Sequence, residues 1–355
     1  MPLRILFTCG RELGYPRNTI IWHALARHFE VTTVTDSNSS MPIRYLRVVG
    51  KLISAPRREI DLLFVGFLGQ PLMLLAKRLT GKPILFDAFL SVYDTLCFDR
   101  KLYDPRSPVG RLAYWLDKTS CNNADHIILD TKAHCRYFFN TFGIPHEKLS
   151  ALFVGCDENI FYPRPSQNTT PLVLYYGSYL PLQGIDVIVR AAKLLENISG
   201  VRFRIIGEGI ESARIRYIVK ELAIQNIDFL PPVPLERLPD HISQAMVCLG
   251  GHFGASEKAS RVIAGKTFQC IAMGKPTIVG DNPANGELLT HGFDAWFCPM
   301  NDPQSLADSI LRLIDDPHLR DELGNNAHQT FIQQASIQVI SLQLRDLIEQ
   351  LSKKK

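Results

Sequence analysis

Short apolar runs alternate with helical patterns along this chain, and the whole alternation occurs twice. The first series predicts strands at 4–8, 31–34, 45–49, 62–65, 84–86 and 126–129. The second predicts strands at 172–176, 202–206, 227–230, 247–249, 277–279 and 295–298. Strands that alternate with helices are typical of parallel sheets covered by helices on both faces. The predicted fold class is therefore α/β, with two doubly wound, Rossmann-like domains.

A break in composition separates the two series. Residues 161–171 have no periodicity and contain three prolines, which is typical of a linker. A chain of 355 residues is also long for one core, so two domains are expected. We place the first domain at 1–163, the second at 164–335, and a terminal helix with a basic tail at 336–355. Whether this helix crosses back to pack on the first domain is left open. A cleft between the domains, beyond the carboxyl ends of the strands, is the expected ligand site.

Composition narrows the function classes and the compartment. The net charge of +4 is mild, and no basic stripe with interleaved aromatics argues for nucleic acid. The eight cysteines are scattered, which favours buried thiols in a reducing cytosol over a disulfide framework or a zinc site. The most apolar region, 62–79, is too interrupted to span a bilayer. A cytoplasmic protein is expected, and lysines 353–355 leave open a peripheral contact with the inner face of a membrane.

One stretch, 261–287, carries the most specific local signal. Gly265 is a predicted helix start, and Gly274 is placed where a left-handed C-terminal cap would fall. Lys266 in the first turn opposes the helix dipole, so an anion such as a phosphate group is expected there. Gln269 shares a face with Lys266 one turn later. A plain surface lysine is the alternative, whereas a phosphate-binding P-loop is disfavoured because Ser260 stands where that motif needs glycine.

Several segments together resemble family 4 glycosyltransferases of the GT-B type. They are the strand–loop–helix at 176–186, the Gly-Glu-Gly turn at 207–209, the Gly-Cys-Asp at 155–157 and the Gln-Cys-Ile-Ala-Met-Gly-Lys-Pro at 269–276. The resemblance covers nearly the whole chain. It implies transfer of a sugar from a nucleotide-sugar donor to an acceptor hydroxyl, with retention of configuration and with no cofactor. A glycan or a lipid-linked acceptor is expected from the same resemblance.

Two departures from the family pattern affect the donor site. Gln183 stands before Gly184 where the family usually has lysine, and Lys266 or Arg261 is the expected substitute cation. The family's E-x7-E pair is also absent, because Arg261 and Gln269 occupy its two positions and Glu257 is the nearest acid upstream. The residues expected to bind the donor are Gly177, Gln183, Gly184, Arg261, Lys266, Gln269 and Glu287.

The chemistry expected at this site follows from the leaving group. Breaking a sugar–phosphate bond develops negative charge on a nucleoside diphosphate, and fixed cations with backbone N–H groups can stabilise it. The sequence contains no D-x-D motif of the kind that binds a metal, so a metal site is not predicted.

In the first domain, Asp87 ends a predicted strand and is the first candidate for the catalytic residue that acts on the acceptor; Glu257 is the second. The alternative for Asp87 is a role in a loop or as a helix cap. Gly10, Gly14 and Arg17 form a turn expected on the acceptor side.

Two other readings of the same fold stay open. A nucleotide-sugar epimerase or a sugar phosphorylase would need more catalytic acids and histidines, or a lysine for a cofactor. A non-catalytic subunit that binds a sugar nucleotide would explain the missing E-x7-E carboxylates. A dinucleotide-binding GxGxxG motif is absent from the sequence, so a nicotinamide enzyme is not predicted.

Overall fold

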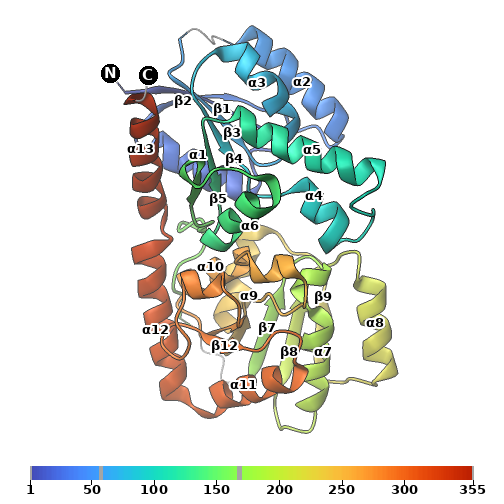
Figure 1. Ribbon diagram of the computed structural model, residues 1–355. Coiled ribbons are helices and arrows are strands. Elements are labelled where there is room, and N and C mark those ends of the chain that lie inside the picture. Colours follow the sequence, from blue (N-terminus) through green and yellow to red (C-terminus); the bar gives the residue numbers. More distant parts are fainter. Residues whose placement is uncertain (1, 56–58, 166–169, 354–355) are drawn as a thin grey trace. The chain divides into compact units, whose positions relative to one another are not determined.

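The computed structural model folds both halves of the chain around parallel sheets (Figure 1) and describes residues 2–55, 59–165 and 170–353. The chain divides into two units, one of residues 1–155 with 337–355 and the other of residues 156–336. The boundary therefore lies between Gly155 and Cys156, earlier than the break expected after Pro163, and the first unit takes the C-terminal helix. Part of the expected linker, residues 166–169, lies outside the described residues.

Unit 1 is built on a six-stranded parallel sheet of order β2-β1-β3-β4-β5-β6. Its strands are β1 (Arg4–Cys9), β2 (Glu30–Val34), β3 (Leu62–Gly66), β4 (Ile84–Asp87), β5 (His126–Leu129) and β6 (Leu149–Ala151). Its helices are α1 (Pro16–Ala26), α2 (Met41–Ser54), α3 (Gln70–Thr80), α4 (Val92–Asp94) with the π-turn Thr95–Asp99, α5 (Pro108–Asn123), α6 (Lys132–Phe142) and α13 (Ile337–Lys353).

The two faces of this sheet have separate cores because successive side chains of a strand point to opposite faces. Ile5 and Phe7 of β1 pack with α1 and with the buried side of α13. Leu6, between them, packs with side chains of α2, α3 and α6. The terminal helix thus completes one face of the unit 1 sheet, so the crossing back to the first domain that the sequence left open does occur.

Unit 2 has a second six-stranded parallel sheet, of order β12-β11-β10-β7-β8-β9. Its strands are β7 (Leu172–Tyr176), β8 (Arg202–Ile206), β9 (Ile227–Leu230), β10 (Val247–Leu249), β11 (Thr277–Gly280) and β12 (Trp296–Cys298). Its helices are α7 (Ile185–Leu194), α8 (Ser212–Glu221), α9 (Leu238–Gln244), α10 (Gly265–Ala272), α11 (Pro303–Asp315) and α12 (Pro317–Gln334). The predicted fold class, α/β with two parallel sheets, is confirmed.

One secondary-structure prediction was wrong, and strand β6 and helix α12 were not predicted. Residues 45–49 were predicted as a strand but lie inside helix α2, whose buried positions Arg44, Val48 and Leu52 recur every four residues. That helical spacing decided the outcome over the β-branched pair Val48–Val49. Helix α12 was not predicted at all, because its surface is polar on most sides and its apolar periodicity is weak.

All eight cysteines are free and buried, as the scattered spacing predicted. Among the described residues, no helix is both long and apolar enough to cross a membrane.

Candidate functional site

The cation expected at the start of α10 is buried in unit 2. Lys266 is only 7% exposed, and its Nζ donates a hydrogen bond to Oε1 of Gln183, which lies in the turn before α7. Nζ also lies 4.8 Å from the centre of the Tyr175 ring, a cation–π contact. Burial lowers the pKa of Lys266 to about 7. The structure thus brings together two predicted donor residues, Lys266 and Gln183, that are far apart in sequence.

Two glycines, Gly177 and Gly251, lie beside the Lys266 amine and place no side chain in the space next to it. A Cβ on Gly177 would lie 3.2 Å from Cε of Lys266, and one on Gly251 would lie 3.7 Å from Nζ. Both glycines have positive φ, which L side chains rarely adopt. Two backbone segments can therefore approach the amine closely, as backbone groups do around phosphates.

The N-terminus of α10 adds backbone donors next to the amine. Its N-cap, Ala264, offers no side chain to the first N–H groups of the helix, and such groups are satisfied by water, side chains or anions. Lys266 stands in this first turn, as predicted, and Gly274 ends the segment with φ of 65°. The helix start and the lysine together favour a negatively charged ligand.

His252 is a neighbour that the sequence did not single out. It follows β10, is buried, and has no hydrogen-bond partner at Nδ1 among the described residues. Burial and the nearby Lys266 charge lower the pKa of His252 to about 3. His252 is therefore neutral at physiological pH and places a polar atom, not a second cation, beside Lys266.

The side chain of Gln269 is fixed by a hydrogen bond from Tyr176, the last residue of β7. The Tyr176 hydroxyl donates to Oε1 of Gln269 at 2.9 Å, and it lies 3.4 Å from the Lys266 carbonyl oxygen. This bond fixes the amide on the Lys266 side of α10 and leaves its NH₂ group to donate. Two tyrosines directly before Gly177, at the carboxyl end of β7, were the sequence signal that could have revealed Tyr175 and Tyr176.

The remaining predicted donor residues lie on two neighbouring turns. Arg261 is paired with Glu257 at 3.3 Å, and the Glu257 side chain is 88% exposed. Glu287 is half-buried at the end of the turn Asn285–Glu287. A backbone hydrogen bond from Ala284 to Ser260, 3.3 Å long, joins the two turns. Arg261 and Glu257 thus form a partly exposed ion pair, separate from the buried Lys266 contact.

In unit 1 the predicted acceptor residues Arg17 and Asp87 form a buried ion pair. Arg17 Nε and Nη2 each donate to one carboxylate oxygen of Asp87 at 3.1 Å, and its Nη1 donates to the carbonyls of Leu152 and Phe153 at 2.9 Å. Burial raises the pKa of Asp87, and the Arg17 charge opposes that shift. Both carboxylate oxygens are engaged and the side chain is fully enclosed, so this geometry favours a structural role over the expected proton acceptor.

The other two acceptor-side glycines differ from each other. A Cβ on Gly10 would lie 1.9 Å from the Leu68 carbonyl oxygen, so the loop after β1 needs glycine there. Gly14 has open space around it, and nothing in the structure demands glycine at that position. The sequence also missed a buried pair beyond β5, in which Asp130 and His134 Nδ1 lie 2.6 Å apart.

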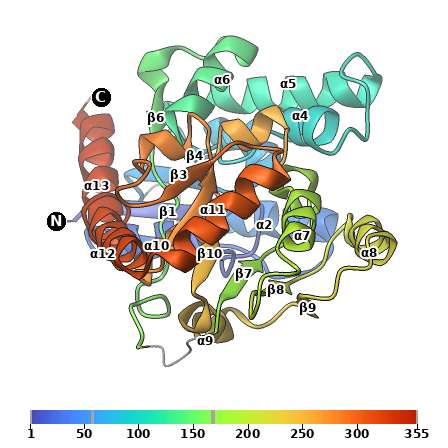
Figure 2. The same cartoon turned by 90° about the horizontal axis from the view of Figure 1, so that it is seen from below.

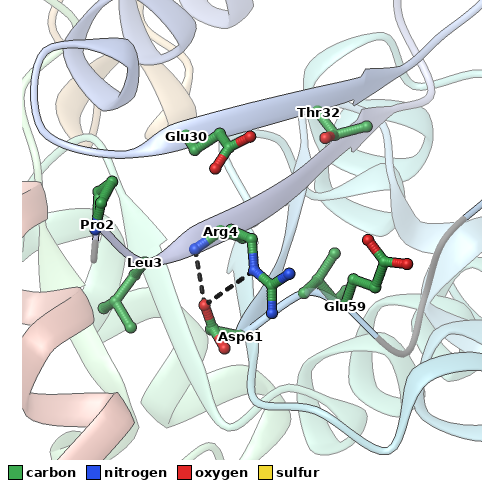
Figure 3. Close-up of a pocket in the computed structure, with 8 residues that line it drawn as sticks. Pro2, Leu3, Arg4, Glu30, Thr32, Glu59 and Asp61 are labelled. Carbon is green, nitrogen blue, oxygen red and sulfur yellow. Dashed lines mark hydrogen bonds and ion pairs between the residues drawn. The ribbon is translucent and has the colours of Figure 1, made fainter.

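A hollow of about 630 Å³ in unit 1 does not fit the expected ligand (Figure 3). It lies at the amino ends of β1, β2 and β3, whereas parallel sheets bind ligands at the carboxyl ends. Three carboxylates line it, and its single arginine, Arg4, is engaged by Asp61 through both its backbone N–H and its side chain. Its lining residues are Pro2, Leu3, Arg4, Glu30, Thr32, Glu59, Ile60 and Asp61.

Gly184 positions Gln183 for its contact with Lys266. It has φ of 67°, and a Cβ there would lie 2.5 Å from the Gly254 nitrogen and the Phe253 carbonyl carbon. We expect Gly184→Ala to destabilise unit 2 by about 2 kcal/mol or more, since both the dihedral and the contact are unfavourable. Thermal unfolding measures this. Gly286→Ala, where a Cβ meets open space, is the control; equal melting temperatures for the two variants would contradict the assignment.

Comparison with solved structures defines the class of fold. Anabaena HepE, solved with UDP, superimposes with a TM-score of 0.73 at 16% identity over 98% of this chain and 100% of that one. Sucrose-phosphate synthase from Thermosynechococcus elongatus gives a TM-score of 0.76 at 17% identity over 99% and 100%. The two parallel six-stranded sheets therefore have the GT-B fold.

Sequence comparison adds a match in the second half of the chain. Residues 157–330 match the family described as glycosyl transferases group 1. An uncharacterized glycosyltransferase of Methanocaldococcus jannaschii is 22% identical over 250 residues, covering 65% of this chain and 67% of that protein. The chain spans between 21% and 67% of the length of the first curated relatives that it matches.

Proposed function

We propose that this chain is a retaining glycosyltransferase that takes a sugar from a nucleoside-diphosphate donor without a metal. The observation that carries the proposal is the buried Lys266 amine, which contacts an amide oxygen and an aromatic face. Neither neighbour carries a negative charge, and a buried cation without an anion is unfavourable. A diphosphate would supply that anion at the site where the sugar–phosphate bond breaks.

Each donor group has a place in this proposal. Lys266 and the first amides of α10 stabilise the charge that develops on the leaving diphosphate. Gly177 and Gly251 have no side chains, so the backbone at these two positions can approach the diphosphate. Gln269 offers its NH₂ group to the donor's ribose, where the family resemblance implies a carboxylate. Arg261, which pairs with Glu257 after the turn before α10, is proposed as a second cation for the diphosphate. Retention of configuration follows from the resemblance alone, and the acceptor is proposed to be a glycan or a lipid-linked sugar.

A thermal-shift panel tests the donor proposal. A ligand that binds only the folded state stabilises it by mass action, by about 2.7 kcal/mol at a hundred times its dissociation constant. UDP, GDP and ADP and their sugar conjugates form the panel, and UDP is the first probe because the structure of Anabaena HepE holds it. We expect one nucleoside diphosphate to raise the melting temperature most. A panel with no shift would contradict the proposal.

Binding of the diphosphate should take up a proton at alkaline pH. The free Lys266 pKa of about 7 lies below its ordinary value, and a bound diphosphate raises it again. Above pH 7 the amine must therefore be protonated on binding, so the affinity falls as the pH rises, by at most about tenfold per unit. Calorimetry at pH 8 in two buffers of different ionisation enthalpy should show this uptake in the wild type and not in Lys266→Met. An affinity that is flat between pH 7 and 9 would contradict it.

Transfer should not require a divalent metal. The fixed cations Lys266 and Arg261 are proposed to stabilise the leaving group, and the sequence has no paired-aspartate motif. Initial rates with and without a chelator should agree. Loss of activity on chelation, restored by magnesium or manganese, would overturn this account of the leaving group.

A non-catalytic, nucleotide-binding subunit is the second candidate. Arg261 and Gln269 stand where the family resemblance places two carboxylates, and that substitution favours a site that binds without reacting. The two candidates predict the same donor affinity and differ only in transfer by the purified chain.

A further inference from the structure

Helix α5 of unit 1 has its polarity reversed relative to an ordinary surface helix. Its buried positions are small or polar and include Gly110, Asp117 and Ser120. Its exposed positions carry the large apolar side chains Leu112, 61% exposed, and Trp115, 50% exposed. Surface helices normally bury their apolar stripe. The outward apolar face of α5 therefore needs an explanation other than the core of unit 1.

The inner face of α5 is fixed by hydrogen bonds, so the helix has a defined orientation. The Asp117 carboxylate accepts from the Ser91 hydroxyl at 2.8 Å and from the backbone of Tyr93 at 2.9 Å. The Ser120 hydroxyl donates to the Gln70 carbonyl at 2.9 Å. These polar contacts would be lost if the helix rolled to bury Leu112 and Trp115.

Exposed apolar side chains continue from α5 into the connection that precedes it. Phe98, Leu102 and Tyr103 are between 44% and 59% exposed. The connection packs on the start of α5, since a Cβ on Gly110 would lie 2.5 Å from the Asp104 carbonyl oxygen. Among the described residues, six of the eighteen exposed large hydrophobic side chains fall within residues 98–115. We call this surface the α5 patch: Phe98, Leu102, Tyr103, Val109, Leu112 and Trp115.

The α5 patch is bordered by positive charge. Exposed cations interrupt or flank it, and Asp104 is the one exposed carboxylate between residues 98 and 118; Asp99 and Asp117 are buried. In the described part of the chain, no ion pair neutralises any of these cations. They are Arg100, Lys101, Arg106, Arg111 and Lys118. Figure 2 shows α5 along the rim of unit 1, with the connection from α4 beyond its start.

We propose that the α5 patch docks on the surface of an anionic lipid bilayer. Apolar side chains with basic neighbours on one helix face are the combination that binds the interface of such membranes, where leucine and tryptophan enter the acyl boundary and cations meet the headgroups. A second copy of the chain fits less well, because a symmetric contact would bring five cations against the same five. The proposal stands apart from the donor site, which lies in unit 2.

Vesicle binding by the full chain, without nucleotide or acceptor, tests this proposal. The probes are vesicles of phosphatidylcholine alone and of phosphatidylcholine mixed with phosphatidylglycerol. We expect co-sedimentation with the anionic vesicles only, weakened by salt, and a blue shift of tryptophan fluorescence that disappears in Trp115→Phe. Leu112→Ser with Trp115→Ser should lower the vesicle affinity about tenfold or more, and Arg111→Glu with Lys118→Glu should lower it by a similar factor.

A matched control uses an apolar pair of similar exposure whose neighbouring charges are balanced. Ile210 and Tyr217 of unit 2 are 66% and 65% exposed, and Arg214 between them is paired with Glu211 and Asp186. Ile210→Ser with Tyr217→Ser should leave vesicle binding unchanged. Absence of binding to anionic vesicles, equal binding to neutral ones, or equal loss in the control would overturn the proposal. So would self-association through Leu112 and Trp115 without vesicle binding.

Discussion

Lys266→Ala should weaken the affinity for the nucleoside diphosphate about tenfold to a hundredfold. The substitution removes a charge-assisted contact, which corresponds to roughly 1.5–3 kcal/mol. It also leaves Oε1 of Gln183 without its buried donor. Calorimetric titration with UDP measures the change, and circular dichroism checks that unit 2 still folds. Folding should be retained, because the wild-type amine is buried and forms no ion pair with any residue that the structure describes.

Lys275→Ala is the matched control for that result. Lys275 follows the same helix but lies beyond its other end, where its Nζ donates to the Ser243 carbonyl at 3.1 Å. Its removal should change the UDP affinity by less than about twofold. Lys266→Arg distinguishes charge from shape, since guanidinium keeps the charge but is larger. An unchanged dissociation constant in Lys266→Ala would reduce this residue to a structural lysine.

Asp87→Asn should destabilise unit 1 by about 3–5 kcal/mol. The substitution leaves the Arg17 guanidinium, 1% exposed, without its counter-charge, and breaking a buried ion pair from one side costs about that much. The new NH₂ group also faces the N–H donors of Arg17, so one of the two hydrogen bonds is lost. Urea unfolding followed by circular dichroism measures the effect, with the unit 2 transition as an internal reference.

Two variants sharpen this experiment. Asp61→Asn removes a carboxylate that pairs with Arg4 at an exposed site, so it should cost less than about 1 kcal/mol. Replacing both members of the buried pair, as Arg17→Met with Asp87→Leu, should recover much of the stability lost in Asp87→Asn. If Asp87→Asn unfolded like the wild type and yet lost sugar transfer about a hundredfold, Asp87 would be catalytic and the structural role would be wrong.

The sequence predicted the fold well because buried parallel strands are continuous apolar runs that need no partner to be recognised. Strands β7, β8 and β9 were placed at the residues where the structure has them. The strand predicted at 45–49 failed because an apolar run of that length fits a helix face equally well, and only the burial of Arg44 and Leu52 decides between them.

The sequence identified most residues of the candidate site, but it did not predict which of them contact one another. Gln183 was identified as a departure from the family, with Lys266 or Arg261 as the substitute cation. The bond between Gln183 and Lys266 joins residues that only the sheet order β10-β7 brings together. Arg17 and Asp87 were both expected to face an acceptor. Their mutual pairing depends on the distance between α1 and the end of β4, which no local pattern encodes. His252 gave no signal, because its neutrality comes from burial beside Lys266.

Release of the nucleoside diphosphate tests the proposed activity most directly. The purified chain is incubated with UDP-, GDP- and ADP-sugars, a chelator, and an extract of glycan and lipid-linked acceptors. The free diphosphate is then measured in parallel for the wild type and Lys266→Ala. A glycosyltransferase should release diphosphate from one donor in an acceptor-dependent reaction that Lys266→Ala slows about tenfold or more. Binding of a nucleotide sugar with no release from any donor would contradict the proposed activity and leave a non-catalytic binding subunit.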